Sequence, residues 1–258
     1  MKKVFIIFCT CISIHVFAQQ NNYTGANAHS HNDYEQPVPF YEAWQNGFGS
    51  IEADIFLHDG KLLVAHEVKE LNSSRSLDSL YLKPLQRAIE KNKGYPYADK
   101  NKQLQLLIDV KSDSVATLNK LIEVLNNYPA IINCHSIKIA ISGNRPAPEN
   151  FVDYPSYIYF DGVVSKDYSA EALSKIVMLS DNFRNYSAWN GSDTLAETDR
   201  QRLSNAVGKA HALKRKIRFW NAPDNANSWQ TFMRLQVDYI NTDHIKALAT
   251  FLNETEKK

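Results

Sequence analysis

Apolar and polar positions along this chain alternate between two periods. Short runs rich in Val, Ile and Leu, for example at 50–57, 104–111 and 137–143, are typical of strands buried on both faces. Between such runs, apolar residues recur three and four positions apart, as at Leu118, Leu121 and Leu125, which is the spacing of a helix with one buried side. The pattern therefore predicts parallel strands separated by amphipathic helices.

The alternation recurs about eight times, which favours a closed barrel. Strands are predicted at 26–30, 50–57, 104–111, 137–143, 157–164, 176–179, 217–221 and 237–243, with a further short extended run at 62–65. Helices are predicted at 39–44, 77–89, 115–125, 203–213, 229–235 and 245–252. Pro84 is expected to bend or delay its helix, and the helix between the fifth and sixth strands is poorly marked. We expect one α/β domain at 19–258, a (β/α)8 TIM-type barrel.

The first residues have the pattern of a processing signal. Lys2 and Lys3 precede an apolar stretch at 4–17, and Ala18 provides a small residue at a cleavage position. The apolar stretch is too short for a comfortable membrane span, so a retained anchor is the weaker alternative. We expect a signal peptide at 1–18, export to the periplasm or the extracellular space, and no transmembrane anchor after processing.

The cysteine count and the net charge limit the classes of protein to which this chain can belong. Removal of the signal peptide leaves Cys134 as the single cysteine, so no internal disulfide is expected and the core must hold the fold. The formal net charge is +1 and there is no basic run. A nucleic-acid-binding protein would show a concentrated basic face. We therefore expect a monomer that binds no nucleic acid.

Acidic residues interrupt the predicted strands at 50–57 and 104–111, where apolar residues are the rule. Glu52 and Asp54 are two positions apart and project from the same face. Asp109 shares a face with Lys111 on the next long strand. An ion-pair cluster with Lys111 would be the structural explanation, but three acids outnumber that one cation. One hard divalent cation would satisfy the carboxylates.

Histidines complete the pattern around these acids. In chain order the motif residues are His29, Glu52, Asp54, His66, Asp109 and Lys111. This arrangement resembles the PLC-like phosphodiesterase superfamily: glycerophosphodiester phosphodiesterases, phosphatidylinositol-specific phospholipases C and sphingomyelinase-D-like enzymes. The opening at 29–32, His-Ser-His-Asn, is closer to the His-x-x-Asn of the sphingomyelinase-D-like branch than to the His-Arg-Gly of the glycerophosphodiesterases. That difference weakens the expectation of a glycerophosphodiester substrate.

The resemblance implies a metal-dependent phosphoric diester hydrolase of the glycerophosphodiester phosphodiesterase or phospholipase C type. Glu52, Asp54 and Asp109 would bind one Mg²⁺ or Ca²⁺, and Lys111 would meet the phosphate of a soluble diester or a lipid head group. The family pattern makes His29 and His66 the catalytic acid/base pair. Which histidine is the acid stays open, as does the choice between water and a substrate hydroxyl as the attacking group.

Four further residues are candidates for substrate binding. His31 would bind substrate, orient His29 or cap the following turn. Asn32 fits the opening motif, although Asn-Asp before a turn is also ordinary turn chemistry. Arg145 follows the fourth strand and is placed to clamp a phosphate, with a solvated surface arginine as the alternative. Trp220 is expected either to wall the pocket or to pack in the core.

Two other classes of protein stay in view. The pair His29-x-His31 at the end of a first barrel strand also looks like the zinc-binding pair of amidohydrolases, for which Asp243 would supply the acid on the last strand. That class needs further histidines on later strands, and His135 and His211 do not fall there. The third class is a non-catalytic barrel that binds lipid head groups or glycans.

Overall fold

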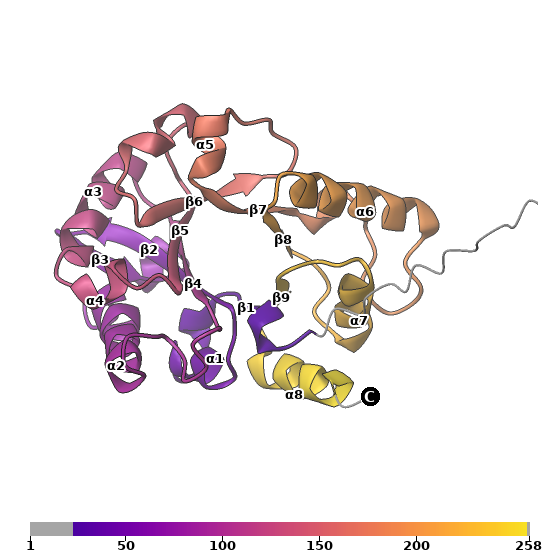
Figure 1. The fold of residues 1–258 in the computed structure, drawn as a ribbon, viewed down its shortest axis with the longest axis horizontal. Helices are drawn as coiled ribbons and strands as arrows, with labels where there is room; N and C mark the ends of the chain where they lie inside the picture. The colour runs from indigo at the N-terminus through magenta and orange to yellow at the C-terminus, as the bar shows by residue number, and fades with distance from the viewer. Residues whose placement is uncertain (1–22, 257–258) are drawn as a thin grey trace, which may run out of the picture.

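The computed structural model describes residues 23–256, so the predicted signal peptide at 1–18 lies outside the described residues. An inner ring of strands is surrounded by helices, which confirms the predicted (β/α)8 barrel (Figure 1). The ring follows the order β8-β7-β6-β5-β4-β2-β1-β9, with every pairing parallel. Its strands are β1 (Ala28–Ser30), β2 (Ser50–His58), β4 (Leu104–Val110), β5 (Ile137–Gly143), β6 (Ile158–Val163), β7 (Ile176–Asn182), β8 (Lys216–Trp220) and β9 (Ile240–Thr242).

The ring closes through a weaker contact between β8 and β9. A single parallel bridge joins Arg218 to Tyr239, and the Tyr239 N–H donates to the Ile217 carbonyl oxygen at 3.1 Å. The strand predicted at 237–243 is correspondingly short, because only 240–242 pair with β1. The other strands of the barrel are therefore paired continuously, whereas few backbone hydrogen bonds join β8 to β9.

The helices lie outside the ring and connect successive strands (Figure 1). They are α1 (Tyr41–Gln45), α2 (Lys83–Lys91), α3 (Ser114–Leu125), α4 (Pro129–Ile132), α5 (Ala170–Ser174), α6 (Glu197–Ala212), α7 (Ala226–Arg234) and α8 (Ile245–Glu256). Pro84 stands in the first turn of α2, which continues directly from a π-helix at Asp78–Leu82, so the helix is not delayed but changes geometry just before Pro84. The poorly marked helix is α5, a short one.

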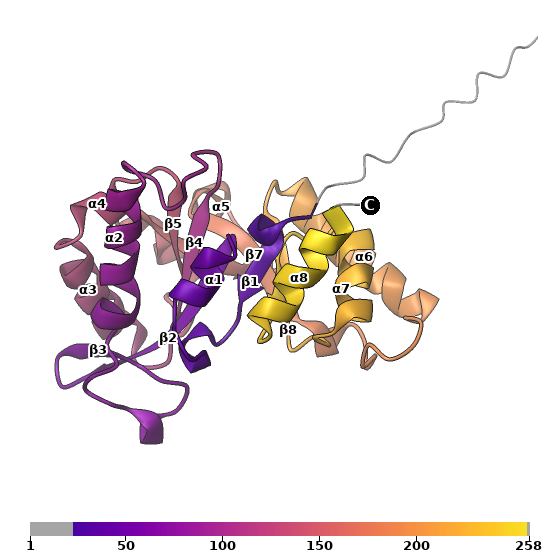
Figure 2. The same ribbon diagram turned by 90° about the horizontal axis from the view of Figure 1, so that it is seen from below.

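The predicted extended run at 62–65 is β3 (Lys61–Val64), which pairs antiparallel with the end of β2. Asp59 and Gly60 make the turn with φ of 48° and 71°. The chain after β3 projects beyond the carboxyl ends of the barrel strands (Figure 2). This hairpin sets His66 at that end of the barrel.

Alternate residues of each strand face the barrel interior and form layers. Neighbouring strands align Leu107 with Ala140, and these two pack with Met178 and Tyr239 in an apolar layer. The larger apolar core lies between the strands and the helices. The apolar layer separates the interior at the amino ends of the strands from the interior at their carboxyl ends.

Two further expectations concern disulfides and membrane spans. Cys134, the cysteine within 23–256, carries a free thiol. Over the same residues, we find no helix with both the length and the apolar character needed to cross a bilayer.

The loop before β6 provides a test of the core. Phe151 is 1% exposed and stacks on Phe160 of β6 with ring centroids 3.8 Å apart. Phe151→Ala should lower the free energy of unfolding by about 3–5 kcal/mol, because it removes a buried ring and leaves a cavity. Urea denaturation measures the loss, and the exposed neighbour Val152 gives the control, since Val152→Ala should change stability by less than about 0.5 kcal/mol. Equal losses in the two variants would contradict this packing.

Candidate active site

Three carboxylates meet at the carboxyl ends of β2 and β4. Parallel pairing sets Asp54 directly beside Asp109, and Glu52 lies two residues earlier on the same face of β2. Glu52, Asp54 and Asp109 each offer an oxygen within 4.8 Å of the others. Gly143 makes room for them, because a Cβ at this position would collide with Asp109 Oδ1. The three predicted metal ligands are thus brought together by strand register.

Two cations balance this acidic cluster. Lys111 Nζ lies 2.9 Å from Asp54 Oδ2 and 3.1 Å from Asp109 Oδ1. Arg218, from β8, donates to Glu52 Oε2 at 2.7 Å and is 4% exposed. Burial alone would raise the pKa of Glu52, but the charge of Arg218 and the contact with His29 lower it. Burial and the charges of Glu52 and Asp109 raise the pKa of Asp54 to about 6, against the effect of Lys111.

The cluster still has hydrogen-bonding capacity that the described residues leave unused. Asp54 Oδ1 is buried and accepts no hydrogen bond, and the buried Asp109 Oδ1 has the ion-pair contact with Lys111 but accepts no hydrogen bond either. A buried carboxylate oxygen without a donor is costly. Carboxylate oxygens are the ligands that Mg²⁺ and Ca²⁺ prefer. The donor set therefore fits one hard divalent cation, held by Glu52, Asp54 and Asp109.

His66 stands at the rim of the same cluster. Its Nδ1 lies 3.1 Å from Asp54 Oδ2 and 3.1 Å from the Tyr34 hydroxyl. The Tyr34 hydroxyl also lies 2.8 Å from Asp54 Oδ2 and 2.9 Å from Asn32 Oδ1. The side chain of His66 is 48% exposed. With Nδ1 held by these groups, Nε2 is the nitrogen left for a ligand in the pocket.

His29 has a different environment, because it is fully buried. Its Nδ1 lies 2.8 Å from Ser50 Oγ, and its Nε2 lies between Glu52 Oε2 at 2.7 Å and Arg218 Nη1 at 2.6 Å. Burial and the charge of Arg218 lower its pKa to about 4. Both ring nitrogens of His29 are therefore in contact with protein groups rather than with the pocket.

His31 lines the pocket instead. Its Nδ1 lies 2.8 Å from Asp243 Oδ1, across the pairing of β1 with β9. Asp243 is fixed in turn, since its backbone N–H donates to Asp224 Oδ2 at 2.8 Å. Burial lowers the pKa of His31, but the hydrogen bond to Asp243 and the charges of Glu52 and Asp243 outweigh it, so the net shift is upward. This arrangement orients the imidazole and leaves Nε2 without a hydrogen-bond partner among residues 23–256.

These groups open into a cavity of about 440 Å³ at the carboxyl ends of the strands. Its lining includes eight of the ten residues singled out from the sequence: His31, Asn32, Glu52, His66, Asp109, Lys111, Arg145 and Trp220. Asp54 and His29 lie beneath that lining. Trp220 is 40% exposed, so it walls the cavity rather than packing in the core. Arg145 donates to the Gly143 carbonyl oxygen at 3.3 Å and faces the same opening.

The sequence patterns did not single out Arg218 or Asp161, which lie deep in this cavity. Asp161 on β6 is 2% exposed, accepts a hydrogen bond from Ser180, and keeps Oδ1 without a donor. Arg218 Nη2 lies 3.9 Å from Asp161 Oδ2. Burial raises the pKa of Asp161 to about 6, although Arg218 and Arg145 oppose the shift. A charged residue flanked by apolar strand residues, as in Ile217-Arg218-Phe219, was the available signal.

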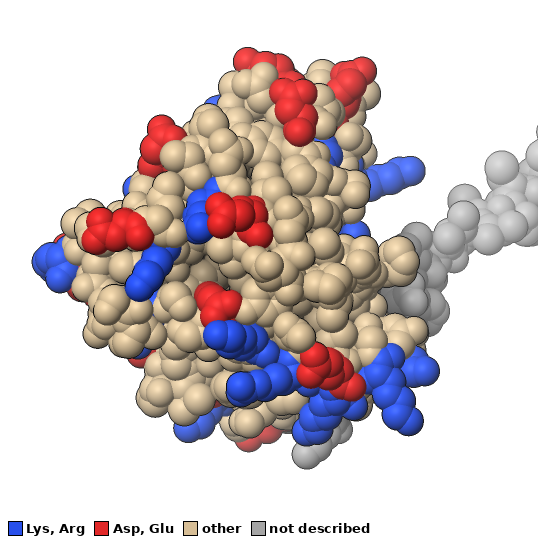
Figure 3. All heavy atoms as spheres, turned by 90° about the vertical axis from the view of Figure 1, so that its left-hand side faces the viewer, with Lys and Arg blue, Asp and Glu red and all other residues tan. Residues whose placement is uncertain are grey.

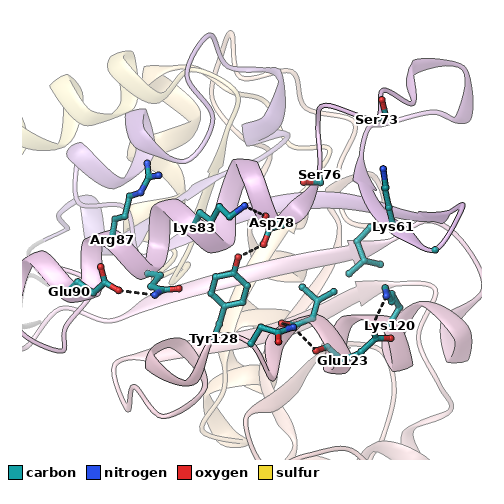
Figure 4. Close-up of a pocket in the computed structure, with 15 residues that line it drawn as sticks. Lys61, Ser73, Ser76, Asp78, Lys83, Arg87, Glu90, Lys120, Glu123 and Tyr128 are labelled. Carbon is teal, nitrogen blue, oxygen red and sulfur yellow. Dashed lines mark hydrogen bonds and ion pairs between the residues drawn. The ribbon is translucent and has the colours of Figure 1, made fainter.

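A larger cavity, of about 860 Å³, lies outside the barrel between α2 and α3 (Figure 4). Two of its four cations are paired with its own acids, Lys83 with Asp78 and Lys120 with Glu123. Acidic and basic side chains intermix over this side of the molecule (Figure 3). It holds none of the motif residues, so we name it the outer groove and place the candidate site in the barrel mouth.

The zinc alternative receives no support from the geometry. Within residues 23–256, the cluster with metal-ligand spacing is the acidic one at Glu52, Asp54 and Asp109. His29 and His31 contact separate partners, Glu52 and Asp243. The donor set available here therefore suits a hard cation bound by oxygen better than zinc bound by imidazole.

Comparisons with known proteins agree with this geometry. The family model described as AIM6-like phosphodiesterase domain matches residues 19–131, and the model described as glycerophosphoryl diester phosphodiesterase family matches residues 216–245. Between them, the two matches include the acidic cluster, the histidines His29, His31 and His66, and the strand that carries Arg218.

Individual relatives match over most of the chain. The protein named altered inheritance of mitochondria protein 6 from Eremothecium gossypii is 27% identical, over 86% of this chain and 68% of its own. Its namesake from Kluyveromyces lactis is 26% identical, over 87% and 72%. A solved glycerophosphodiester phosphodiesterase from Parabacteroides distasonis shares the fold, with a TM-score of 0.54 and 14% identity over 89% of this chain and 97% of that one.

Asp161 gives a pH-dependent prediction. Its pKa of about 6 in the folded protein exceeds the ordinary value of about 4. The folded state therefore holds this proton to higher pH than the unfolded state, so stability is lost as pH rises from 4 through 6. Asp161→Asn has no carboxyl group to titrate, so its free energy of unfolding should not show this loss. Relative to the parent, its free energy of unfolding should increase by up to about 3 kcal/mol from pH 4 to pH 7.5. Urea unfolding across that range measures it; parallel stability profiles would contradict it.

Proposed function

Because the chain belongs to the PLC-like phosphodiesterase superfamily, we propose that it hydrolyses phosphoric diesters with the help of one divalent cation. The observation that carries the proposal is the acidic cluster: among the described residues, the buried Asp54 Oδ1 accepts no hydrogen bond, and Asp109 Oδ1 has only the ion-pair contact with Lys111. Lys111 and two histidines stand around the cluster in one cavity. Diesters with a small polar alcohol, either soluble glycerophosphodiesters or phospholipids, are the substrate class.

The cation would be Mg²⁺ or Ca²⁺ bound by Glu52, Asp54 and Asp109. When bound, it would supply positive charge for the phosphoryl oxygens. Lys111 adds a second positive charge from the same wall of the cavity, since its ammonium group lies against Asp54 and Asp109. Such charges stabilise the developing negative charge of the transition state more than the ground state.

Proton transfer needs two imidazoles that reach the substrate. We assign these roles to His66 and His31, because both line the cavity and each has Nδ1 held by a carboxylate. One imidazole takes the proton of the attacking hydroxyl as its oxygen bonds to phosphorus. The other gives a proton to the leaving oxygen as its bond to phosphorus breaks. The raised pKa of His31 favours it as the acid.

His29, the histidine expected in this pair from the family pattern, receives a positioning role in the proposal. Its contacts with Ser50, Glu52 and Arg218 orient Glu52 from below. The attacking group, water or a substrate hydroxyl, is open in this scheme. Either one loses its proton to the same base.

We also propose that the protein acts after export, as a monomer, with residues 1–18 removed. The motivation is the charged and apolar pattern of the amino terminus. Mass spectrometry of the protein recovered outside the cytoplasm should find a chain that begins near Gln19. A product that keeps Met1 and sediments with membranes would contradict the export proposal.

Metal binding is the first test of the proposed site. Asp54→Asn should weaken Mg²⁺ and Ca²⁺ binding by about 10-fold or more, because it removes one of three charged ligands, and it should abolish turnover. Isothermal titration of the folded variant measures the affinity. Asp181 lines the same cavity with both oxygens hydrogen-bonded, so Asp181→Asn should leave metal affinity near that of the parent. Stoichiometric binding of zinc alone, lost in His31→Ala, would favour the amidohydrolase reading.

Substrates with different leaving groups distinguish the roles of His31 and His66. His31→Ala and His66→Ala should each lower the rate on a natural diester by about 10²–10⁴-fold. A nitrophenyl diester needs little protonation as it leaves, so it should partly rescue His31→Ala and leave His66→Ala slow. Rates are measured with metal bound in each variant.

The matched variant is His29→Gln, which should lower metal affinity and rate together. If His29→Gln alone is rescued by the nitrophenyl substrate while His31→Ala turns over at the parent rate, the roles of His29 and His31 are exchanged. Parent rates in all three variants would show that the histidines are structural.

A further inference from the structure

The amino-terminal end of the barrel contains a second concave site. Its cavity of about 280 Å³ lies beneath the apolar layer of Leu107, Ala140 and Met178, at the opposite end of the strands from the acidic cluster. The lining comes from the first residues of β4 to β8, from residues shortly before these strands and from Tyr239. This site, which we call the lower mouth, shares no residue with the candidate active site.

The lower mouth is lined by one sign of charge. Its cations are Lys138, Lys214, Arg215 and Lys216, and no Asp or Glu is among the described residues that line it. None of the four makes an ion pair within 4.0 Å among the side chains described. The outer groove has as many cations but pairs Lys83 and Lys120 with acids. Unpaired cations that converge on a small cavity therefore distinguish the lower mouth.

Strand register explains why these cations converge. Lys138 faces the interior two residues before Ala140, and Lys216 does so two residues before Arg218. Each ammonium lies over a tyrosine ring, Lys138 over Tyr159 at 4.7 Å and Lys216 over Tyr239 at 4.4 Å. The rings hold the charges at the cavity without neutralising them.

Polar groups with spare capacity accompany the charges. Lys216 Nζ donates to the Tyr239 hydroxyl at 2.9 Å, and that hydroxyl donates its own proton to the Gly49 carbonyl oxygen at 3.5 Å, so the other protons of the ammonium are left for a ligand. Arg215 Nε is buried without an acceptor. The remaining walls include Leu104, Ile176 and Val177. A cleft with charges of one sign and apolar walls concentrates the field on an ion inside it.

We propose that the lower mouth binds a small dianion of the phosphate type, either free phosphate or a phosphomonoester. Four cations around one cavity suit a double negative charge better than a single one, and lysine and arginine are the usual phosphate ligands in proteins. Binding would relieve the mutual repulsion of the cations. The site goes beyond the proposed diester hydrolysis, because it uses none of the residues assigned to that reaction.

The test is isothermal titration of inorganic phosphate into the full-length protein, in EDTA and at low ionic strength. The parent should show saturable binding that Lys138→Gln/Lys216→Gln weakens by about tenfold or more. Lys83→Gln/Lys120→Gln removes the same charge from the outer groove and should leave the affinity near that of the parent. The exposed Lys214→Gln gives a third variant, with a smaller loss, should the first fail to fold. Higher salt should weaken the binding in the parent.

Three other outcomes would contradict a phosphate site at the lower mouth. Phosphate binding that survives Lys138→Gln/Lys216→Gln and disappears in Lys111→Ala would belong to the active site. Binding to vesicles containing phosphatidic acid, with none to inorganic phosphate, would indicate a surface for lipid and not a small-ligand cavity. Absence of saturable phosphate binding at low ionic strength also contradicts it.

The phosphate-binding test at the lower mouth is independent of the proposed diester hydrolysis. Diester turnover should be kept in Lys138→Gln/Lys216→Gln, since neither residue touches the active site. Phosphate binding at the lower mouth should be kept in Asp54→Asn, whether or not the parent cleaves diesters. Failure of one proposal therefore leaves the other standing.

Discussion

Three carboxylates gathered from two neighbouring parallel strands repel one another, and the mouth of this barrel is built around that repulsion. Strand register forces the approach, because Glu52 and Asp54 share a face and Asp54 pairs directly with Asp109. Arg218 and Lys111 reduce the repulsion without removing it, since three negative charges meet two positive ones. Some carboxylate oxygens of the cluster accept no hydrogen bond from the described residues, and a bound cation would satisfy them.

The period-two alternation of the strands gives the barrel interior two different ends. On β5 the inward residues read Lys138, Ala140 and Ser142, and on β8 they read Lys216, Arg218 and Trp220. An apolar layer lies between the cationic lower end and the acidic upper end. Charge of opposite sign at the two ends is compatible with a stable core, because side chains that fill the interior keep the two sets apart.

Prediction from the sequence went furthest where the chemistry is local. Most strand and helix positions and the inward pairing of Glu52 with Asp54 follow from short-range spacing, and the structure agrees. Long-range partners do not follow from spacing: Arg218 reaches Glu52 across 166 positions, and Asp243 reaches His31 across 212. How deeply each histidine is buried likewise depends on the closure of the barrel. His29 and His31 share a face, yet His29 lies one layer lower, beside Ser50 and Glu52.

A cation at the acidic cluster and a diester in the same cavity should lie in direct contact. Mn²⁺ is a paramagnetic substitute for Mg²⁺, and a non-hydrolysable phosphonate analogue of a diester reports through its phosphorus resonance. That resonance should broaden strongly when protein and Mn²⁺ are both present, and the broadening should disappear in Asp109→Asn. Broadening that persists unchanged in Asp109→Asn, or no broadening with both ligands bound, would contradict this contact.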